Sequence, residues 1–161
     1  MIESFCHWLA STPASAYFSG APWIVPTVQS IHIVCVAVVF ASMCMLSFRL
    51  LGIAAGMRPV TAVARPILSW LWPALLLLLL TGAVMITAEP ARELLNTIFM
   101  LKMLLVATAA VACWILRRSL SRSPQAWSDT PRRVTSKCAG VVFLCLWISI
   151  VVCGRWIAYT Q

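Results

Sequence analysis

Four long apolar stretches are the feature that most constrains the fold of this chain. They run over residues 27–48, 67–88, 98–116 and 138–157. About 20 apolar residues in a helix are enough to cross the hydrocarbon of a bilayer. The chain has 161 residues, of which 62% are hydrophobic and 10% charged, and its mean hydropathy is +0.96. We therefore predict an all-α integral membrane protein, a four-helix bundle that forms a single transmembrane domain over residues 1–161.

The segment before the first apolar stretch reads MIESFCHWLASTP and predicts a short amphipathic helix. Ile2, Phe5, Trp8 and Leu9 recur at helical spacing, which places them on one face. The segment carries an acidic residue and no Lys or Arg, unlike the basic start of a secretory signal peptide. We expect a helix over residues 2–10 that lies on the membrane surface and is ended by Pro13.

Basic residues predict the orientation of the helices, because Lys and Arg remain on the cytoplasmic side of a bacterial membrane. Arg92, Lys102 and Arg155 fall on one side of the predicted bundle. The other side carries Arg49, Arg58, Arg65, Arg117, Arg118, Arg122, Arg132, Arg133 and Lys137. We therefore expect a multi-pass protein of the bacterial inner membrane with both termini in the periplasm. The net charge of +8 then reflects the orientation of the protein, and the basic residues also attract anionic lipid headgroups. Nucleic acid is not an expected partner.

Polar residues of all four predicted spans fall in the outer third of the bundle. His32 lies about 7 Å below the start of the first span, and Lys102 lies at a similar depth in the third, at about 1.5 Å of rise per residue. A charge at membrane depth costs about 2.5–3.5 kcal/mol unless it is paired or wetted. We therefore predict an outward-facing polar pocket formed by His32, Gln29, Glu89, Arg92, Glu93, Lys102, Arg155 and Tyr159.

The charged members of this set predict ion pairs between helix ends. Glu89 is expected to pair with Lys102, and Glu93 with either Arg92 or Arg155, since pairing lowers the cost of charge in the membrane. Positions three and four apart share one face of a helix. On the fourth predicted span, this spacing favours an inward face formed by Cys145, Ser149, Val152 and Arg155.

Five motifs carry a resemblance to a known family. In chain order they are WIVPTVQSIHIV, FRLLGI, TGAVMITAEP, NTIFMLK and GRWIAY. Over residues 21–159 the chain resembles an uncharacterised family of small four-helix bacterial inner-membrane proteins, a domain of unknown function, and this resemblance implies fold and location alone. Ser47 and Gln29 stand where the resemblance leads us to expect acidic residues. A weaker likeness, to copper-resistance membrane domains, rests on a helix histidine and soft side chains.

Three hypotheses for His32 stay open. In the first, His32 is structural and hydrogen-bonds Gln29, a neighbouring hydroxyl or a carboxylate, as polar side chains do between membrane helices. In the second, the protein holds haem b or copper, because neutral imidazole is a good ligand for these metals. In the third, the pocket binds or conducts a small molecule or ion that arrives from the periplasm. The candidate metal ligands are His32, Cys35, His7, Met85 and Met103.

The sequence contains no pattern that predicts hydrolytic catalysis. Ser30 and His32 are two residues apart and point to different sides of a helix, so they cannot act as nucleophile and base. We therefore expect a non-enzymatic inner-membrane component that is linked to haem or metal chemistry. The alternatives are a binding or permeation subunit and a purely structural subunit of a membrane complex. The expected partners are the lipid bilayer and a periplasmic or membrane protein.

Overall fold

The computed structural model describes residues 2–53, 59–122, 134–157 and 159, and the regular structure of this part of the chain is helical throughout. The expected all-α class is therefore confirmed. Three short helices, α1, α2 and α5, accompany four long ones, α3, α4, α6 and α7, which are long and apolar enough to cross a membrane. Their bounds are α1 (Ile2–Ala10), α2 (Pro13–Gly20), α3 (Ile24–Leu51), α4 (Val60–Ala88), α5 (Pro90–Leu94), α6 (Thr97–Arg122) and α7 (Val134–Trp156).

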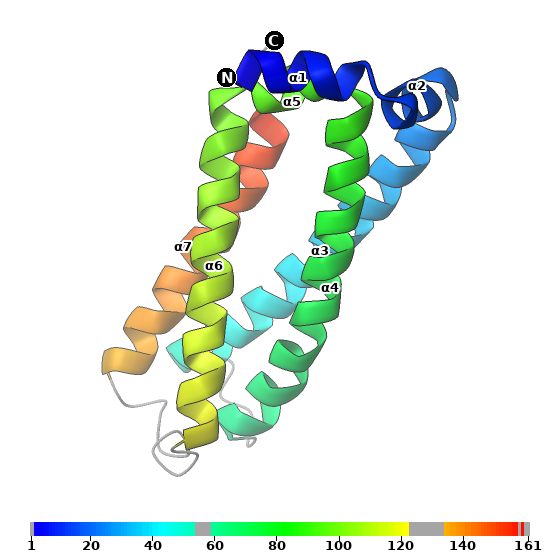
Figure 1. The fold of residues 1–161 in the computed structure, drawn as a ribbon. Helices are drawn as coiled ribbons and strands as arrows, with labels where there is room; N and C mark the ends of the chain where they lie inside the picture. The colour runs from blue at the N-terminus through cyan, green and yellow to red at the C-terminus, as the bar shows by residue number, and fades with distance from the viewer. Residues whose placement is uncertain (1, 54–58, 123–133, 158, 160–161) are drawn as a thin grey trace.

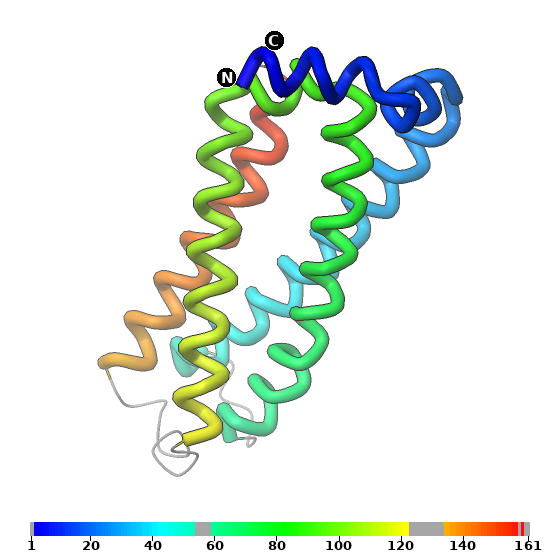
Figure 2. Tube along the Cα trace, viewed as in Figure 1, coloured from blue at the N-terminus to red at the C-terminus, as the bar shows by residue number. Residues whose placement is uncertain are grey.

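The four long helices form a bundle in which α3 runs obliquely past α4 (Figure 1). α3 packs against both α4 and α7, and α6 packs mainly against α7, whereas α4 and α6 touch sparsely. α1, α2 and α5 lie together at the end where α3 and α6 begin and where α4 and α7 finish (Figure 2). We call this the pocket end, and we call the opposite end, where α3 and α6 finish, the far end.

The long helices exceed the predicted apolar stretches, mostly at the far end. α4 begins at Val60 and α6 continues to Arg122, so each includes polar or charged residues beyond its apolar stretch. A helix continues as long as its backbone hydrogen bonds do, whereas an apolar stretch stops at the first charged residues. Arg58, Arg132 and Arg133, which contributed to the orientation prediction, lie outside the described residues.

Helix ends follow from local sequence signals. α3 ends at Gly52, whose φ of 79° is left-handed, and the N–H groups of Gly52 and Ile53 bond to the carbonyls of Arg49 and Phe48. Glycine suits this position because a side chain would clash there. Pro13 does not simply end the first helix as predicted, since it begins α2 after the hydroxyl of Thr12 accepts from the N–H of Ser15 at 3.3 Å. Proline is well suited to the first turn of a helix, where its missing N–H has no partner to lose.

The far end of the bundle holds a closely packed apolar core. Met43, Leu46 and Leu50 of α3 have no exposed surface, and their neighbours in this core come from α4, α6 and α7. At Gly140 of α7, an added Cβ would lie 2.9 Å from the carbonyl oxygen of Ser47, so α7 approaches α3 too closely for any side chain there. Small residues allow this kind of close approach between membrane helices.

The inward face of α7 differs from the prediction. Of the predicted face, Cys145 and Val152 are exposed, whereas Arg155 lines a cavity near the end of the helix. The buried residues of α7 are Ser136, Gly140, Phe143, Trp147 and Ile150. α7 is apolar on all sides, so the spacing of its few polar residues does not indicate which side packs inward. The contact of Gly140 with α3 decides this orientation instead.

Candidate functional site

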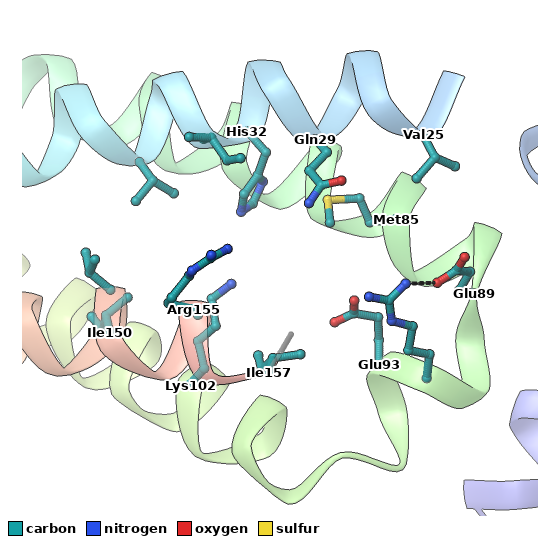
Figure 3. A pocket seen from close by; sticks show the side chains of 15 residues that line it. Val25, Gln29, His32, Met85, Glu89, Glu93, Lys102, Ile150, Arg155 and Ile157 are labelled. Carbon is teal, nitrogen blue, oxygen red and sulfur yellow. Dashed lines mark hydrogen bonds and ion pairs between the residues drawn. The ribbon is translucent and has the colours of Figure 1, made fainter. Parts of the chain in front are cut away.

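A pocket of about 390 Å³ lies at the pocket end, between the first turns of α3 and α6 and the last turns of α4 and α7 (Figure 3). Its polar lining comes from the four long helices, or residues at their ends, and from the short helix α5. The residues that α5 contributes are Arg92 and Glu93. Tyr159 belongs to the predicted set but does not line the pocket. The predicted residues that do line it are Gln29, His32, Glu89, Arg92, Glu93, Lys102 and Arg155.

His32 is tied to the neighbouring helix by a hydrogen bond. Its Nδ1 lies 2.7 Å from Oγ1 of Thr81, and the Thr81 hydroxyl lies 2.8 Å from the carbonyl oxygen of Leu77. Since a hydroxyl has one proton, Thr81 donates to Leu77 and accepts from an Nδ1–H of His32. In this arrangement Nε2 is the unprotonated ring nitrogen of His32. The bond joins α3 to α4 and supplies the neighbouring hydroxyl that the structural hypothesis requires.

Thr81 is the site residue that sequence reasoning missed. It follows a run of six leucines and precedes Gly82, and an ideal Cβ on Gly82 would lie 3.8 Å from Cε1 of His32. A buried hydroxyl in an apolar helix needs a hydrogen-bond partner. The presence of Thr81 in such a helix is therefore the sequence signal that could have identified it as a site residue. Its partner could not be read from the sequence, because His32 lies 49 residues away.

Lys102 projects into the pocket from α6 and lies beside the backbone of α7. An ideal Cβ on Gly154 would be 3.7 Å from Nζ of Lys102, an ordinary contact distance. Glu93 is near enough for its charge to act on Lys102, and Lys102 in turn acts on His32. Among the residues that the structure describes, however, Lys102 has no carboxylate within ion-pair distance.

The predicted pairing of Glu89 with Lys102 is wrong. Glu89 pairs instead with Arg92, whose Nη1 lies 2.6 Å from Oε2 of Glu89, and the two side chains are 48% and 47% exposed. Pro90 starts α5, and one helical turn brings residues three apart onto the same side. This turn lies between the predicted apolar stretches 67–88 and 98–116, so their pattern does not indicate it.

The predicted ion pair of Glu93 with Arg92 or Arg155 is also absent from the described part of the chain. Nη2 of Arg155 donates to Oη of Tyr159 at 2.8 Å, and its guanidinium carbon lies 5.1 Å from the centre of the Tyr159 ring. Tyr159 therefore positions Arg155 from outside the pocket. This contact is not an ion pair, and Arg155 forms none with the carboxylates of the described residues.

The five candidate metal ligands are not brought together. His32 and Met85 line the same pocket, whereas Cys35 does not, although it lies on the same helix as His32. His7 is exposed on α1, and Met103 is 39% exposed on α6. Within the described ranges, the structure contains no group of three His, Cys, Asp or Glu residues that could hold a metal ion. The haem or copper hypothesis therefore has two of its five ligands in one place and stays a prediction.

α1 rests on α5 at the mouth of the pocket. Cys6 of α1 is 3% exposed, and its sulfur lies 3.8 Å from the carbonyl oxygen of Pro90. α5 carries Arg92 and Glu93, so the packing of α1 supports two residues of the pocket lining.

Comparison with known proteins places the pocket inside a recognised domain. The model of a family of unknown function, DUF6644, matches residues 15–160, which include all of the pocket-lining residues. No curated protein and no solved structure matches the chain.

Proposed function

Since this chain belongs to the family of unknown function DUF6644, its function has to be argued from its own residues, and we propose that it is a non-enzymatic membrane protein that binds a small molecule in the pocket. The observation that carries this proposal is the gathering of charged side chains from α5, α6 and α7 with His32 of α3 around one cavity of about 390 Å³. Cavities of about 300–1,000 Å³ are typical of small-molecule sites.

The free-energy cost of placing ionisable side chains at membrane depth supports a function for them beyond packing. Lys102 and His32 lie within helices long enough to span a membrane, where ionisable side chains are expensive and mark functional sites by default. The Glu89–Arg92 pair at the mouth is exposed, and exposed ion pairs stabilise a fold by only about 0–1 kcal/mol. Stability alone therefore does not account for the charged residues.

The packing of the far end favours binding over conduction. Met43, Leu46 and Leu50 have no exposed surface and fill the centre of the bundle there. The pocket lining reaches Val36 and Ile150 and goes no further toward that end. A ligand that enters the pocket of one copy of this chain therefore meets a closed core, which supports a binding site rather than a pore.

The pocket can be tested with paired substitutions and a chemically diverse compound screen. Gly154→Leu would extend a side chain from α7 toward Lys102 and occupy part of the pocket, whereas Ala107→Leu makes a similar addition on the exposed face of α6. We expect compounds that raise the melting temperature of the wild type and of Ala107→Leu to lose this effect on Gly154→Leu. If no compound distinguishes Gly154→Leu from its control, the proposed binding function is wrong.

We further propose that the protein lies in a bacterial inner membrane with the pocket end facing the periplasm. The described basic residues at the far end support this orientation, because cytoplasmic loops are rich in Lys and Arg. They are Arg49, Arg65, Arg117, Arg118, Arg122 and Lys137.

Thiol labelling in intact cells tests this orientation. Ala14 of α2 is exposed at the pocket end, and Ser121 of α6 is exposed at the far end. Ala14→Cys should increase labelling by a membrane-impermeant thiol reagent above the level of the parent chain, whereas Ser121→Cys should not. The reverse pattern would invert the proposed orientation.

A haem b or copper centre is a second candidate for the same pocket, supported by the presence of both His32 and Met85 in its lining. Imidazole and thioether are known axial ligands of haem and also bind copper. Protein purified from its native membrane would then show a Soret band or stoichiometric copper that His32→Ala abolishes. A colourless, metal-free wild type with an intact fold would contradict this candidate.

A further inference from the structure

The pocket places two positively charged side chains, Lys102 and Arg155, beside the imidazole of His32. The side-chain ends of His32, Lys102 and Arg155 point toward one another across the cavity, from α3, α6 and α7 (Figure 3). Neither Lys102 nor Arg155 forms an ion pair with any residue that the structure describes. Like charges repel more strongly where the surroundings are apolar, because the effective dielectric constant is low there.

The two carboxylates of the pocket do not remove this charge. Glu89 is paired with Arg92 at the mouth, so it has little attraction left for the deeper groups. Glu93 acts on Lys102 only from beyond ion-pair distance. Among the residues that the structure describes, the lining therefore has three cationic side chains, Arg92, Lys102 and Arg155, against two carboxylates.

The walls around this charge are apolar. Val36 of α3, Met85 of α4 and Ile150 of α7 line the pocket beside the three nitrogen-bearing groups. An inorganic anion would leave these walls in contact with water. A ligand with a negatively charged group and an apolar body would satisfy both the charge and the walls.

Building on the proposed binding function, we propose that the ligand is a small organic anion. Lys102 and Arg155 bind its carboxylate or phosphate group, and charge-assisted hydrogen bonds of this type are the strongest available to either residue. Its body packs against Val36, Met85 and Ile150. Gly154 contributes by leaving space beside Nζ of Lys102, where a larger side chain would crowd the charged group.

Three probes of similar shape and different charge test this inference. Benzoate, benzamide and benzylammonium would each be titrated calorimetrically into the full-length protein in detergent micelles. We expect benzoate to bind at least tenfold more tightly than either of the other two. Dodecanoate, added as a fourth probe, distinguishes the source of the anion: binding of benzoate supports a water-soluble ligand, and binding of dodecanoate alone supports a lipid-derived one.

Matched variants connect the binding to the proposed residues. Lys102→Met should weaken binding of the preferred anion at least tenfold and leave benzamide unaffected, whereas Lys137→Met makes the same change on the exposed far end of α7 and should have no effect. Arg155→Gln provides a second variant in case Lys102→Met lowers the melting temperature enough to prevent the titration.

Several results would overturn the inference. These are benzamide or benzylammonium binding as tightly as the anions, unchanged anion affinity in both pocket variants, or no binding of any anionic probe. The compound screen with Gly154→Leu tests whether the pocket binds any small molecule, independently of the charge of that molecule. A neutral or cationic compound that binds there would retain the proposed function while excluding an anionic ligand.

Discussion

The two ends of this bundle are built from the same four helices but are packed in different ways. At the far end, α3 and α7 approach each other through Gly140, and side chains such as Met43 and Leu46 are fully buried. At the pocket end, the same helices separate around His32, Lys102 and a cavity of about 390 Å³. Close packing is the main source of stability between membrane helices. The difference therefore assigns most of the stability to the far end and leaves the pocket end available for function.

The largest expected effect compares two methionines. Met43→Ala should lower the free energy of unfolding by about 2–5 kcal/mol, because it opens a cavity in a filled core. Met85→Ala should cost about 1 kcal/mol or less, since Met85 borders a space that already exists. Unfolding in mixed micelles containing increasing SDS measures both values. Equal losses would mean that the two ends are packed equally well.

The next comparison uses two glycines of α7. Gly140→Ala should destabilise the protein by about 1–3 kcal/mol, since its Cβ would lie 2.9 Å from the Ser47 carbonyl oxygen and the Leu51 side chain. At Gly154, a Cβ meets only Lys102, at 3.7 Å. Gly154→Ala should therefore be neutral or stabilise by up to about 1 kcal/mol through helix propensity. The same unfolding assay applies, and a destabilised Gly154→Ala together with an unaffected Gly140→Ala would reverse the comparison.

Interhelical hydrogen bonds provide a smaller contrast. Oγ of Ser136 donates to the carbonyl oxygen of Leu50 at 2.9 Å, in the last turn of α3, where carbonyls have no partner within the helix. Ser136→Ala should cost about 1 kcal/mol. Thr81→Val should cost about 0.5 kcal/mol or less, because water in the pocket can replace the lost partner of His32. A larger loss for Thr81→Val would show that the His32 bond lies in a dry environment.

The smallest expected effect concerns the ion pair at the mouth. A double-mutant cycle with Glu89→Gln and Arg92→Gln should give a coupling of about 0–1 kcal/mol, since both side chains are almost half exposed. A parallel cycle with Glu89→Gln and Lys102→Met should give no coupling within error, because these two residues are not paired. Strong coupling between Glu89 and Lys102 would restore the pairing that the sequence predicted.

Much of the site was accessible from sequence, because polar residues at membrane depth are few and costly. Depth along a helix follows from residue number, so His32, Lys102 and Arg155 could be placed in one layer of the bundle before their neighbours were known. Their contacts could not be predicted in the same way. Thr81 was overlooked as the partner of His32, and Arg92 displaced Lys102 as the partner of Glu89, because α5 turns the backbone just after Pro90.

The sequence by itself determined the class of the protein, its four spans and the layer that holds its polar residues, since each depends on hydrophobicity and on the fixed rise of a helix. The tertiary structure alone decided which side of each helix packs inward. An apolar helix has no strongly polar side to fix its rotation, so Gly140 sets the orientation of α7 by its contact with α3. That rotation brings Gly154 beside Lys102 and places Arg155 in the lining of the pocket.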